Sequence, residues 1–258
     1  MNSSPLSAML ISFLGKGEYW PASYSYPDCE PITCRYGAVA FMAYLKEHKN
    51  VTINRLVICG TDSSSWTLLP SYLEDLAARI FGTDQDPAAV MEGLRKVSRG
   101  ASARELARLA SASRGADFGA EFSEALKAFE NDLSQVLQPA GLVPILIRHA
   151  EDFSTYDRQT DLLHAIQDAG LVTGDTRIYL DITYGLRIMS FMIFTSFQSL
   201  CYTSGIKISG ICYSPEYMPR SEPAERLSFI EGIKNRLRFL KRTAPDLFQK
   251  KSMRWWKF

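Results

Sequence analysis

Short apolar runs alternate with segments of helical periodicity along most of this chain, and this alternation constrains its fold more than any other feature. Five runs are each long enough for one buried strand: residues 9–14, 53–60, 142–149, 177–182 and 206–214. Strands separated by helices pair in parallel, with right-handed crossovers and helices on both faces of the sheet. The sequence therefore predicts an α/β fold with a mostly parallel sheet.

Two segments add to this simple alternation. In residues 19–36, aromatic and β-branched residues alternate around a Pro-Asp pair, which predicts a β-hairpin directly after the first strand. Residues 69–137 have a helical pattern almost throughout, with Gly, Asp or Pro between the segments, and we expect a helical insertion there. We assign residues 1–215 to one ligand-binding α/β domain and residues 220–258 to a basic helical tail.

The composition is that of an ordinary globular protein, with 46% hydrophobic and 22% charged residues. The apolar stretch at 188–203 is shorter than a membrane span and carries Ser, Thr and Gln, so we expect a core helix and no transmembrane segment. No signal-peptide pattern begins the sequence. No C-x-x-C pair occurs among the cysteines, which are Cys29, Cys34, Cys59, Cys201 and Cys212. Reduced, buried thiols in a cytoplasmic protein are therefore expected.

Positive charge gathers at the C-terminus. Residues 220–258 hold eleven Lys or Arg and four Asp or Glu, so this segment carries +7, whereas the whole chain carries +1. Within 225–242 the apolar residues lie along one helical face. A closing helix packed on the body or on a dimer partner is one interpretation. Contact with nucleic acid, a membrane surface or a partner protein is the other.

Ligands of parallel sheets bind beyond the carboxyl ends of the strands, so the loops at those ends form the candidate site. The first of these loops contains Leu14, Gly15, Lys16 and Gly17. Its glycines allow a ligand to approach the backbone closely, and its lysine supplies a positive charge. A plain tight turn is the alternative, because neither the Rossmann glycine pattern nor a P-loop is present.

A polar loop follows the second strand, and its candidate residues are Thr61, Asp62, Ser63, Ser65 and Trp66. Small hydroxyls and backbone N–H groups at a junction between strand and helix suit a phosphate or a ribose. The Trp66 indole offers a face on which a base can stack. The alternative is a helix N-cap with an anchored tryptophan.

The fourth strand ends in DITYGLR, where Gly185 permits a tight bend before Arg187 opens a helix. An arginine in the first turn of a helix opposes the helix dipole, so a bound anion explains it better. We expect a phosphate to contact Thr183, backbone N–H groups and Arg187 together. Asp181 is a lone carboxylate at the end of a strand and is expected to brace its own turn.

These segments resemble a known family. RIYLDITYGLR is similar to the D-[IVL]-T-H-G-x-R signature of CRISPR-associated DxTHG-type proteins, whose sensory fold is the Rossmann-like CARF domain. LISFLGKGEYWPASYSY looks like the first strand and hairpin of that family, and VICGTDSSSW resembles its second strand with a G-T-x-x-S-x-W loop. The likeness covers roughly residues 8–215. Tyr184 stands where the family has histidine, and the usual proline is absent from residues 188–190.

The resemblance implies a homodimer that binds a cyclic oligoadenylate, the second messenger of type III CRISPR antiviral defence, in a cleft across the dimer axis. The phosphates of a tetra- or hexa-adenylate ring would meet both copies of Arg187, Thr183 and the first loop. The adenines would rest against Tyr19, Trp66 or Tyr184. No cofactor is implied, and no cluster of Asp, Glu and His suggests a metal site.

Two functions remain open from the sequence. One is a ring nuclease that cleaves its messenger without metal, with Lys16, Thr183, Tyr184 and Arg187 as catalytic candidates. The other is a non-catalytic sensor whose tail signals to a partner. The HEPN ribonuclease common in relatives has the signature R-x4-6-H, which only RQTDLLH fits, and those two side chains would diverge on a helix. A nucleotide-binding α/β enzyme unrelated to CRISPR ranks last.

Overall fold

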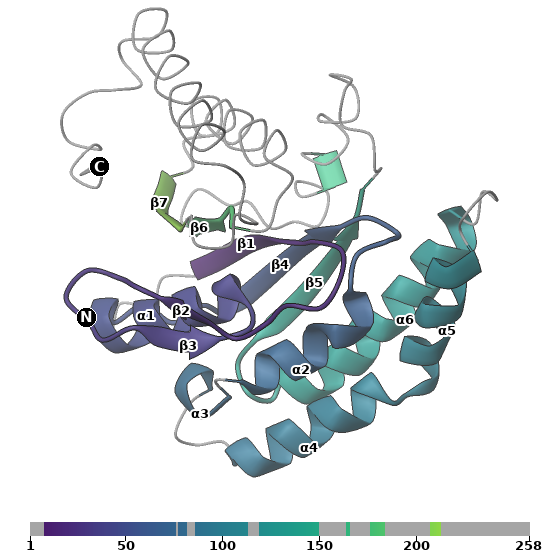
Figure 1. Ribbon diagram of the computed structural model, residues 1–258, viewed down its shortest axis with the longest axis horizontal. Coiled ribbons are helices and arrows are strands. Elements are labelled where there is room, and N and C mark those ends of the chain that lie inside the picture. Colours follow the sequence, from purple (N-terminus) through teal and green to yellow (C-terminus); the bar gives the residue numbers. More distant parts are fainter. Residues whose placement is uncertain are drawn as a thin grey trace, which may run out of the picture. The chain divides into compact units, whose positions relative to one another are not determined.

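The computed structural model describes residues 8–75, 77–81, 86–112, 119–149, 164–165, 176–183 and 207–212 (Figure 1). All of these belong to one compact unit, Met1–Pro215, and the second unit is Glu216–Phe258. The predicted tail helix and the predicted core helix at 188–203 therefore lie outside the described residues.

A five-stranded parallel sheet forms the centre of the first unit. Its strands are β1 (Ala8–Leu14), β4 (Arg55–Gly60), β5 (Val143–Arg148), β6 (Arg177–Asp181) and β7 (Lys207–Cys212). The order across the sheet is β5-β4-β1-β6-β7. The chain thus moves outward from β1 through β4 to β5, and then returns to place β6 on the other side of β1. This is a Rossmann-like order, and it confirms the predicted α/β fold.

The sheet is buried because its strands are nearly continuous apolar runs. All seven residues of β1 are buried, as expected for the central strand of a parallel sheet. The core cluster of the sheet consists of Met9, Ile11, Phe13, Val57, Cys59, Ile147, Ile178 and Leu180. Three of the cysteines, Cys34, Cys59 and Cys212, are buried free thiols, as the sequence predicted, whereas Cys29 is half-buried.

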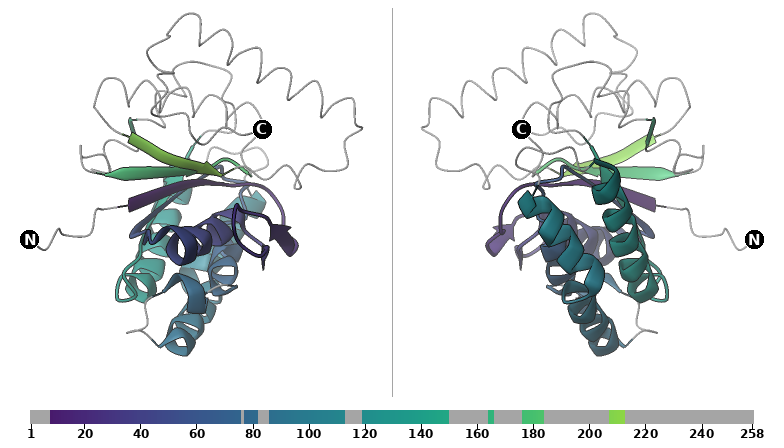
Figure 2. Two further views of the ribbon diagram at one scale, coloured as in Figure 1. Left: turned by 90° about the vertical axis from the view of Figure 1, so that its left-hand side faces the viewer. Right: turned by 90° about the vertical axis from the view of Figure 1, so that its right-hand side faces the viewer.

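The described helices cover one face of the sheet (Figure 2). They are α1 (Gly37–Lys49), the short 3-10 helix η1 (Trp66–Leu68), α2 (Leu69–Glu74), α3 (Ala77–Ile80), α4 (Pro87–Ser98), α5 (Ala101–Ala112) and α6 (Gly119–Leu137). The crossovers from β1 to β4 and from β4 to β5 step in the same direction, so right-handed connections place their helices on the same face. None of the helices in the described ranges is long and apolar enough to cross a bilayer.

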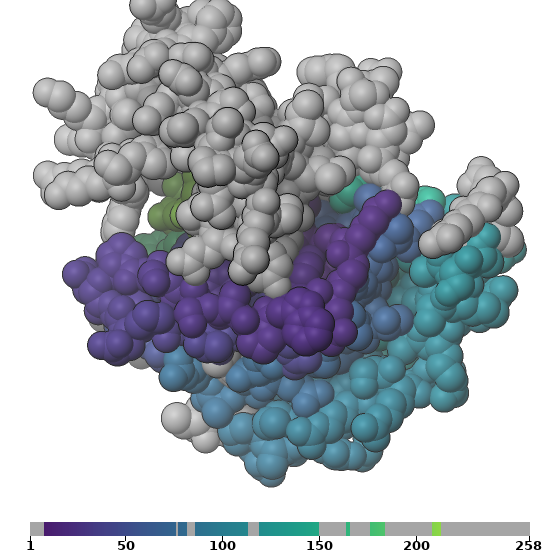
Figure 3. Space-filling model, viewed as in Figure 1, coloured from purple at the N-terminus to yellow at the C-terminus, as the bar shows by residue number. Residues whose placement is uncertain are grey.

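The expected hairpin lies between β1 and α1. Its strands β2 (Ala22–Tyr24) and β3 (Ile32–Cys34) pair antiparallel. Asp28 has a φ of 63°, which is the left-handed conformation that Asp tolerates in tight turns. In the space-filling view, the N-terminal part of the chain that holds the loop after β1 and this hairpin lies at the molecular surface (Figure 3).

The outer edge of β5 is poorly suited to further pairing. The N–H groups of Val143 and His149 donate to the backbone carbonyls of Asn54 and Gly60, on the β4 side. The backbone N–H groups of the alternate residues in β5 therefore point to the outer edge of the sheet. Of these, Pro144 has no N–H group. The N–H of Leu146 donates to Oε2 of Glu130 on α6 over 2.6 Å. A proline and a buried carboxylate therefore remove two of the donors that an added strand would need.

Candidate functional site

The candidate site lies where the strand order reverses. β1 pairs with β4 on one side and with β6 on the other, so the carboxyl ends of these three strands lie side by side. In open parallel sheets this reversal is the usual place for a ligand, because the loops on the two sides diverge there. The loop after β1 is called here the β1 loop (residues 14–20), and the loop after β4 is called the β4 loop (residues 61–66).

The β1 loop is a closed turn with an exposed tip. The Gly15 N–H donates to the hydroxyl oxygen of Tyr19 over 2.5 Å. Lys16 and Gly17 are exposed between them. Gly17 has a φ of 86°, and a Cβ added there would have no atom within 4 Å, so its backbone is open to a ligand. Because Tyr19 already accepts the Gly15 N–H, the expected contact between that N–H and a phosphate is replaced by an internal bond.

Serine side chains fasten the β4 loop to the β1 loop. Ser64 Oγ donates to the Leu14 carbonyl over 2.6 Å, and the Ser65 N–H donates to the Gly15 carbonyl over 3.0 Å. Ser65 Oγ also donates to the Gly17 carbonyl over 2.5 Å. The two loops therefore form one hydrogen-bonded unit. Ser64 was not among the residues predicted from sequence, because its role depends on a strand that precedes it by fifty residues.

The structure assigns Trp66 to packing and leaves it no accessible face for a base. Its ring is 2% exposed, and its Nε1 donates to the Thr61 carbonyl over 2.8 Å. The anchored tryptophan of the alternative interpretation is therefore correct, although Ser65 makes no side-chain capping bond to the helix that follows. The Thr61 side chain is also buried, with its Oγ1 lying 3.0 Å from Ser63 Oγ.

Asp62 is held by an ion pair that the sequence did not reveal. Arg148, at the end of β5, donates from Nε to Oδ1 over 2.5 Å and from Nη2 to Oδ2 over 2.8 Å. This two-pronged geometry engages both carboxylate oxygens. Both carboxylate oxygens of Asp62 therefore already accept one donor each, and the ion pair would compete with a ligand for them.

Asp181 is fully buried beneath the site. Ser12 Oγ donates to Oδ2 over 2.8 Å, and the Thr183 N–H donates to Oδ1 over 3.0 Å, so the carboxylate braces its own turn as predicted. Tyr36 extends the network, with its hydroxyl 2.8 Å from Ser12 Oγ and bonded to the Phe13 carbonyl. Burial raises the pKa of the Asp181 carboxyl, while hydrogen bonds from Thr183 and Ser12 act in the opposite direction.

Thr183 lies against the first turn of α1. A Cβ added to Gly37 would meet Thr183 Oγ1 at 3.3 Å, so the glycine lets the turn after β6 approach the helix. Thr183 is half-buried, and the three remaining candidates of this segment, Tyr184, Gly185 and Arg187, lie outside the described residues. The structure thus brings the β1 loop, the β4 loop and Thr183 to the same end of the sheet.

Among the described residues, the large aromatic side chain that is well exposed next to the β1 loop is Trp20. Tyr19, which was expected to support an adenine, is only 5% exposed and packs against Tyr36 and Tyr72, whose ring centroids lie 5.8 Å apart. Trp20 follows it directly and is 73% exposed. In the sequence, Pro21 follows Trp20 and indicates that the chain turns there. The sequence of two adjacent aromatic residues does not show which of them faces the core.

In the described part of the chain, no group of three His, Cys, Asp or Glu side chains is placed to hold a metal ion. A model of the family described as CRISPR system endoribonuclease Csx1, CARF domain, matches residues 9–215. The matched range includes both loops and the Asp181 turn. No curated protein matches the sequence.

Proposed function

Because the chain belongs to the Csx1 CARF-domain family of CRISPR systems, we propose that it binds a cyclic oligoadenylate at the carboxyl ends of β1, β4 and β6. The observation that carries the proposal is the interlocked pair of loops at the strand reversal, with Lys16 exposed at the tip. A loop that is already held in one conformation loses little entropy when an anion binds, so its affinity is higher than that of a flexible loop.

The charge and the backbone at this loop suit a phosphodiester. Lys16 supplies a cation, and the open backbone at Gly17 allows an oxygen of the ligand to approach closely. Thr183 adds a hydroxyl from the neighbouring strand end. By the family resemblance, Arg187 supplies a second cation. We propose that a homodimer presents two such sets of groups to one ring, because a ring with two-fold symmetry matches an isologous dimer.

We propose Trp20 as the stacking platform for adenine in place of Tyr19 and Trp66. Stacking of a base on an aromatic side chain is worth about 1–3 kcal/mol, and it requires an accessible face. The indole of Trp20 has such a face, and its backbone is held because the preceding Tyr19 is buried. Replacement of Trp20 by Ala is therefore expected to weaken binding by about 5- to 150-fold.

The proposal is tested by titrating the protein with cyclic tetra-adenylate and with cyclic hexa-adenylate in calorimetry, in the presence of EDTA. Saturable binding of either ring at one ring per two chains is expected. Lys16→Ala removes one charged contact and should weaken binding about tenfold or more. Lys96→Ala is the matched control, because this lysine is exposed on α4 and pairs only loosely with Glu92 at 3.9 Å. Absence of binding by the wild-type protein would refute the proposal.

The same samples distinguish a ring nuclease from a sensor. After incubation, linear products with 2′,3′-cyclic phosphate ends would indicate cleavage through the ribose hydroxyl, and intact ligand would indicate a sensor. Lys16 and Thr183, with Tyr184 and Arg187, are the residues to vary if products form. Binding of the ring is the function we propose, and the products decide whether cleavage follows.

A further inference from the structure

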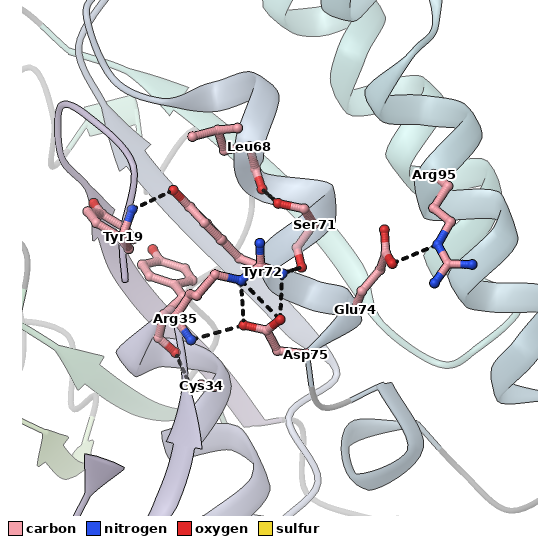
Figure 4. Close-up of polar contacts among 10 residues, drawn as sticks. Tyr19, Cys34, Arg35, Leu68, Ser71, Tyr72, Glu74, Asp75 and Arg95 are labelled. Carbon is pink, nitrogen blue, oxygen red and sulfur yellow. Dashed lines mark hydrogen bonds and ion pairs between the residues drawn. The ribbon is translucent and has the colours of Figure 1, made fainter. Parts of the chain in front are cut away.

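Tyr72, on α2, is a buried tyrosine that reaches the β1 loop from the helical insertion. Its hydroxyl accepts the Tyr19 N–H over 3.1 Å (Figure 4). The rings of Tyr19 and Tyr72 also stack, with centroids 5.1 Å apart and an interplanar angle of 19°. Tyr72 is therefore joined to Tyr19 through both its ring and its hydroxyl.

Tyr19 connects Tyr72 to the tip of the β1 loop through hydrogen bonds. Its backbone is held by Tyr72, and its own hydroxyl accepts the Gly15 N–H over 2.5 Å. Gly15, before Lys16 and Gly17, is thus held by the Tyr19 hydroxyl, and Tyr19, after them, is held by the Tyr72 hydroxyl. A buried N–H that lacks a partner is unfavourable, so loss of the Tyr72 hydroxyl would favour other conformations of this turn.

The helix that carries Tyr72 is itself anchored. Arg35, at the end of β3, bonds to Asp75 and to the Ser71 carbonyl, both on or next to α2 (Figure 4). Its guanidinium carbon lies 5.5 Å from the centroid of the Tyr72 ring. The position of the Tyr72 hydroxyl is therefore defined relative to the hairpin as well as to the sheet.

We propose that Tyr72 is a positioning residue for the ligand site: it sets the conformation of residues 15–19, and so the place of Lys16, before any ligand arrives. The helical insertion thereby contributes to affinity without touching the ligand. This inference rests on the proposed function for its effect on binding, whereas its effect on the loop is independent of the ligand.

The test compares Tyr72→Phe with Tyr44→Phe by amide hydrogen exchange in ligand-free protein. Tyr44 on α1 is the matched control, because it is also buried and stacked on another aromatic ring. It lies about 12 Å along the helix from Tyr36, the residue at the start of α1 that packs against Tyr19. Peptides that cover residues 15–20 are expected to exchange about 3- to 10-fold faster in Tyr72→Phe only. Unchanged exchange there, or an equal increase across the whole chain, would overturn the proposal.

Binding of cyclic tetra-adenylate by the same variants completes the test. Tyr72→Phe is expected to weaken binding about 3- to 10-fold, and Tyr44→Phe to leave it unchanged. Wild-type affinity in Tyr72→Phe, together with faster exchange, would overturn the positioning role. If the wild-type protein binds no ring, the proposed function fails while the exchange experiment still decides the inference. Tyr19→Phe serves as a second variant, because it removes the hydroxyl that accepts the Gly15 N–H and should loosen the same peptides.

Discussion

The ion pair between Arg35 and Asp75 holds the start of the helical insertion against the hairpin, and its removal gives a quantitative test of the structure. Arg35 Nη2 lies 2.5 Å from Asp75 Oδ1, and Nε lies 3.0 Å from Oδ2. The backbone N–H of Arg35 also donates to Oδ2 over 2.9 Å. Asp75→Ala therefore removes the acceptor of two guanidinium nitrogens and of one backbone donor at once.

The expected loss lies between that of a surface pair and that of a buried one. The side chains of Arg35 and Asp75 are 27% and 19% exposed, so water replaces part of what is lost. Exposed pairs contribute about 0–1 kcal/mol, and breaking a buried pair costs about 3–5 kcal/mol, so we expect Asp75→Ala to lower the free energy of unfolding by about 2 kcal/mol. For a domain of this size, that corresponds to a Tm about 4–8 °C lower.

A double-mutant cycle measures the pair itself. Arg35→Ala, Asp75→Ala and the double variant are unfolded by urea and followed by circular dichroism, and a coupling energy of about 1–2 kcal/mol is expected. Glu105→Ala is the control, because Glu105 pairs with Arg108 on the exposed surface of α5 and its loss should leave the Tm unchanged. A coupling energy near zero would show that the pair does not hold the hairpin and α2 together.

Two other predictions concern the strand ends. Gly60→Ala would place a Cβ 2.6 Å from Trp66 Cζ2 and 2.8 Å from Ser64 Oγ, so we expect a loss of about 1–3 kcal/mol in urea unfolding. Wild-type stability of this variant would contradict the tight packing of the β4 loop. Because burial raises the pKa of Asp181, the folded protein binds this proton more tightly than the unfolded chain does. Its contribution to stability is then greatest below the ordinary pKa of Asp, about 3.9, and falls as the pH rises through the folded pKa. The stability of the wild-type protein relative to Asp181→Asn should therefore decrease from acidic to neutral pH, and a constant difference would contradict the raised pKa.

The strands, the hairpin and the turn at Asp181 were predictable because each depends on a local pattern. A buried parallel strand needs a short apolar run, and a hairpin needs alternation on both sides of a turn. The carboxylate of Asp181 accepts the Thr183 N–H, only two residues away, so this bond follows from the local sequence, whereas the bond from Ser12 spans 169 residues.

The exposure of the aromatic residues was not predictable in the same way. Tyr19 and Trp20 are neighbours with similar local sequence, yet one is 5% and the other 73% exposed. What separates them is Tyr72, a residue that reaches Tyr19 from the helical insertion. The ion pair of Asp62 was not predictable either, because its partner Arg148 follows 86 residues later. Polar and aromatic residues in a loop suggest a ligand, but distant parts of the chain decide which of them remain available.

The outer edge of β5, which lacks two N–H donors, is a poor place for two copies of this chain to associate. Many proteins form symmetric pairs by joining two sheets into one continuous sheet through main-chain hydrogen bonds. Here Pro144 has no N–H to donate to such a junction, and Glu130 already accepts the Leu146 N–H. The same arrangement makes the strand a poor template for polymers when the protein is abundant. If two copies of the chain associate, as we propose, the edge of β5 is therefore a poor place for a continuous sheet, and side-chain contacts or the other edge strand, β7, would have to supply the junction.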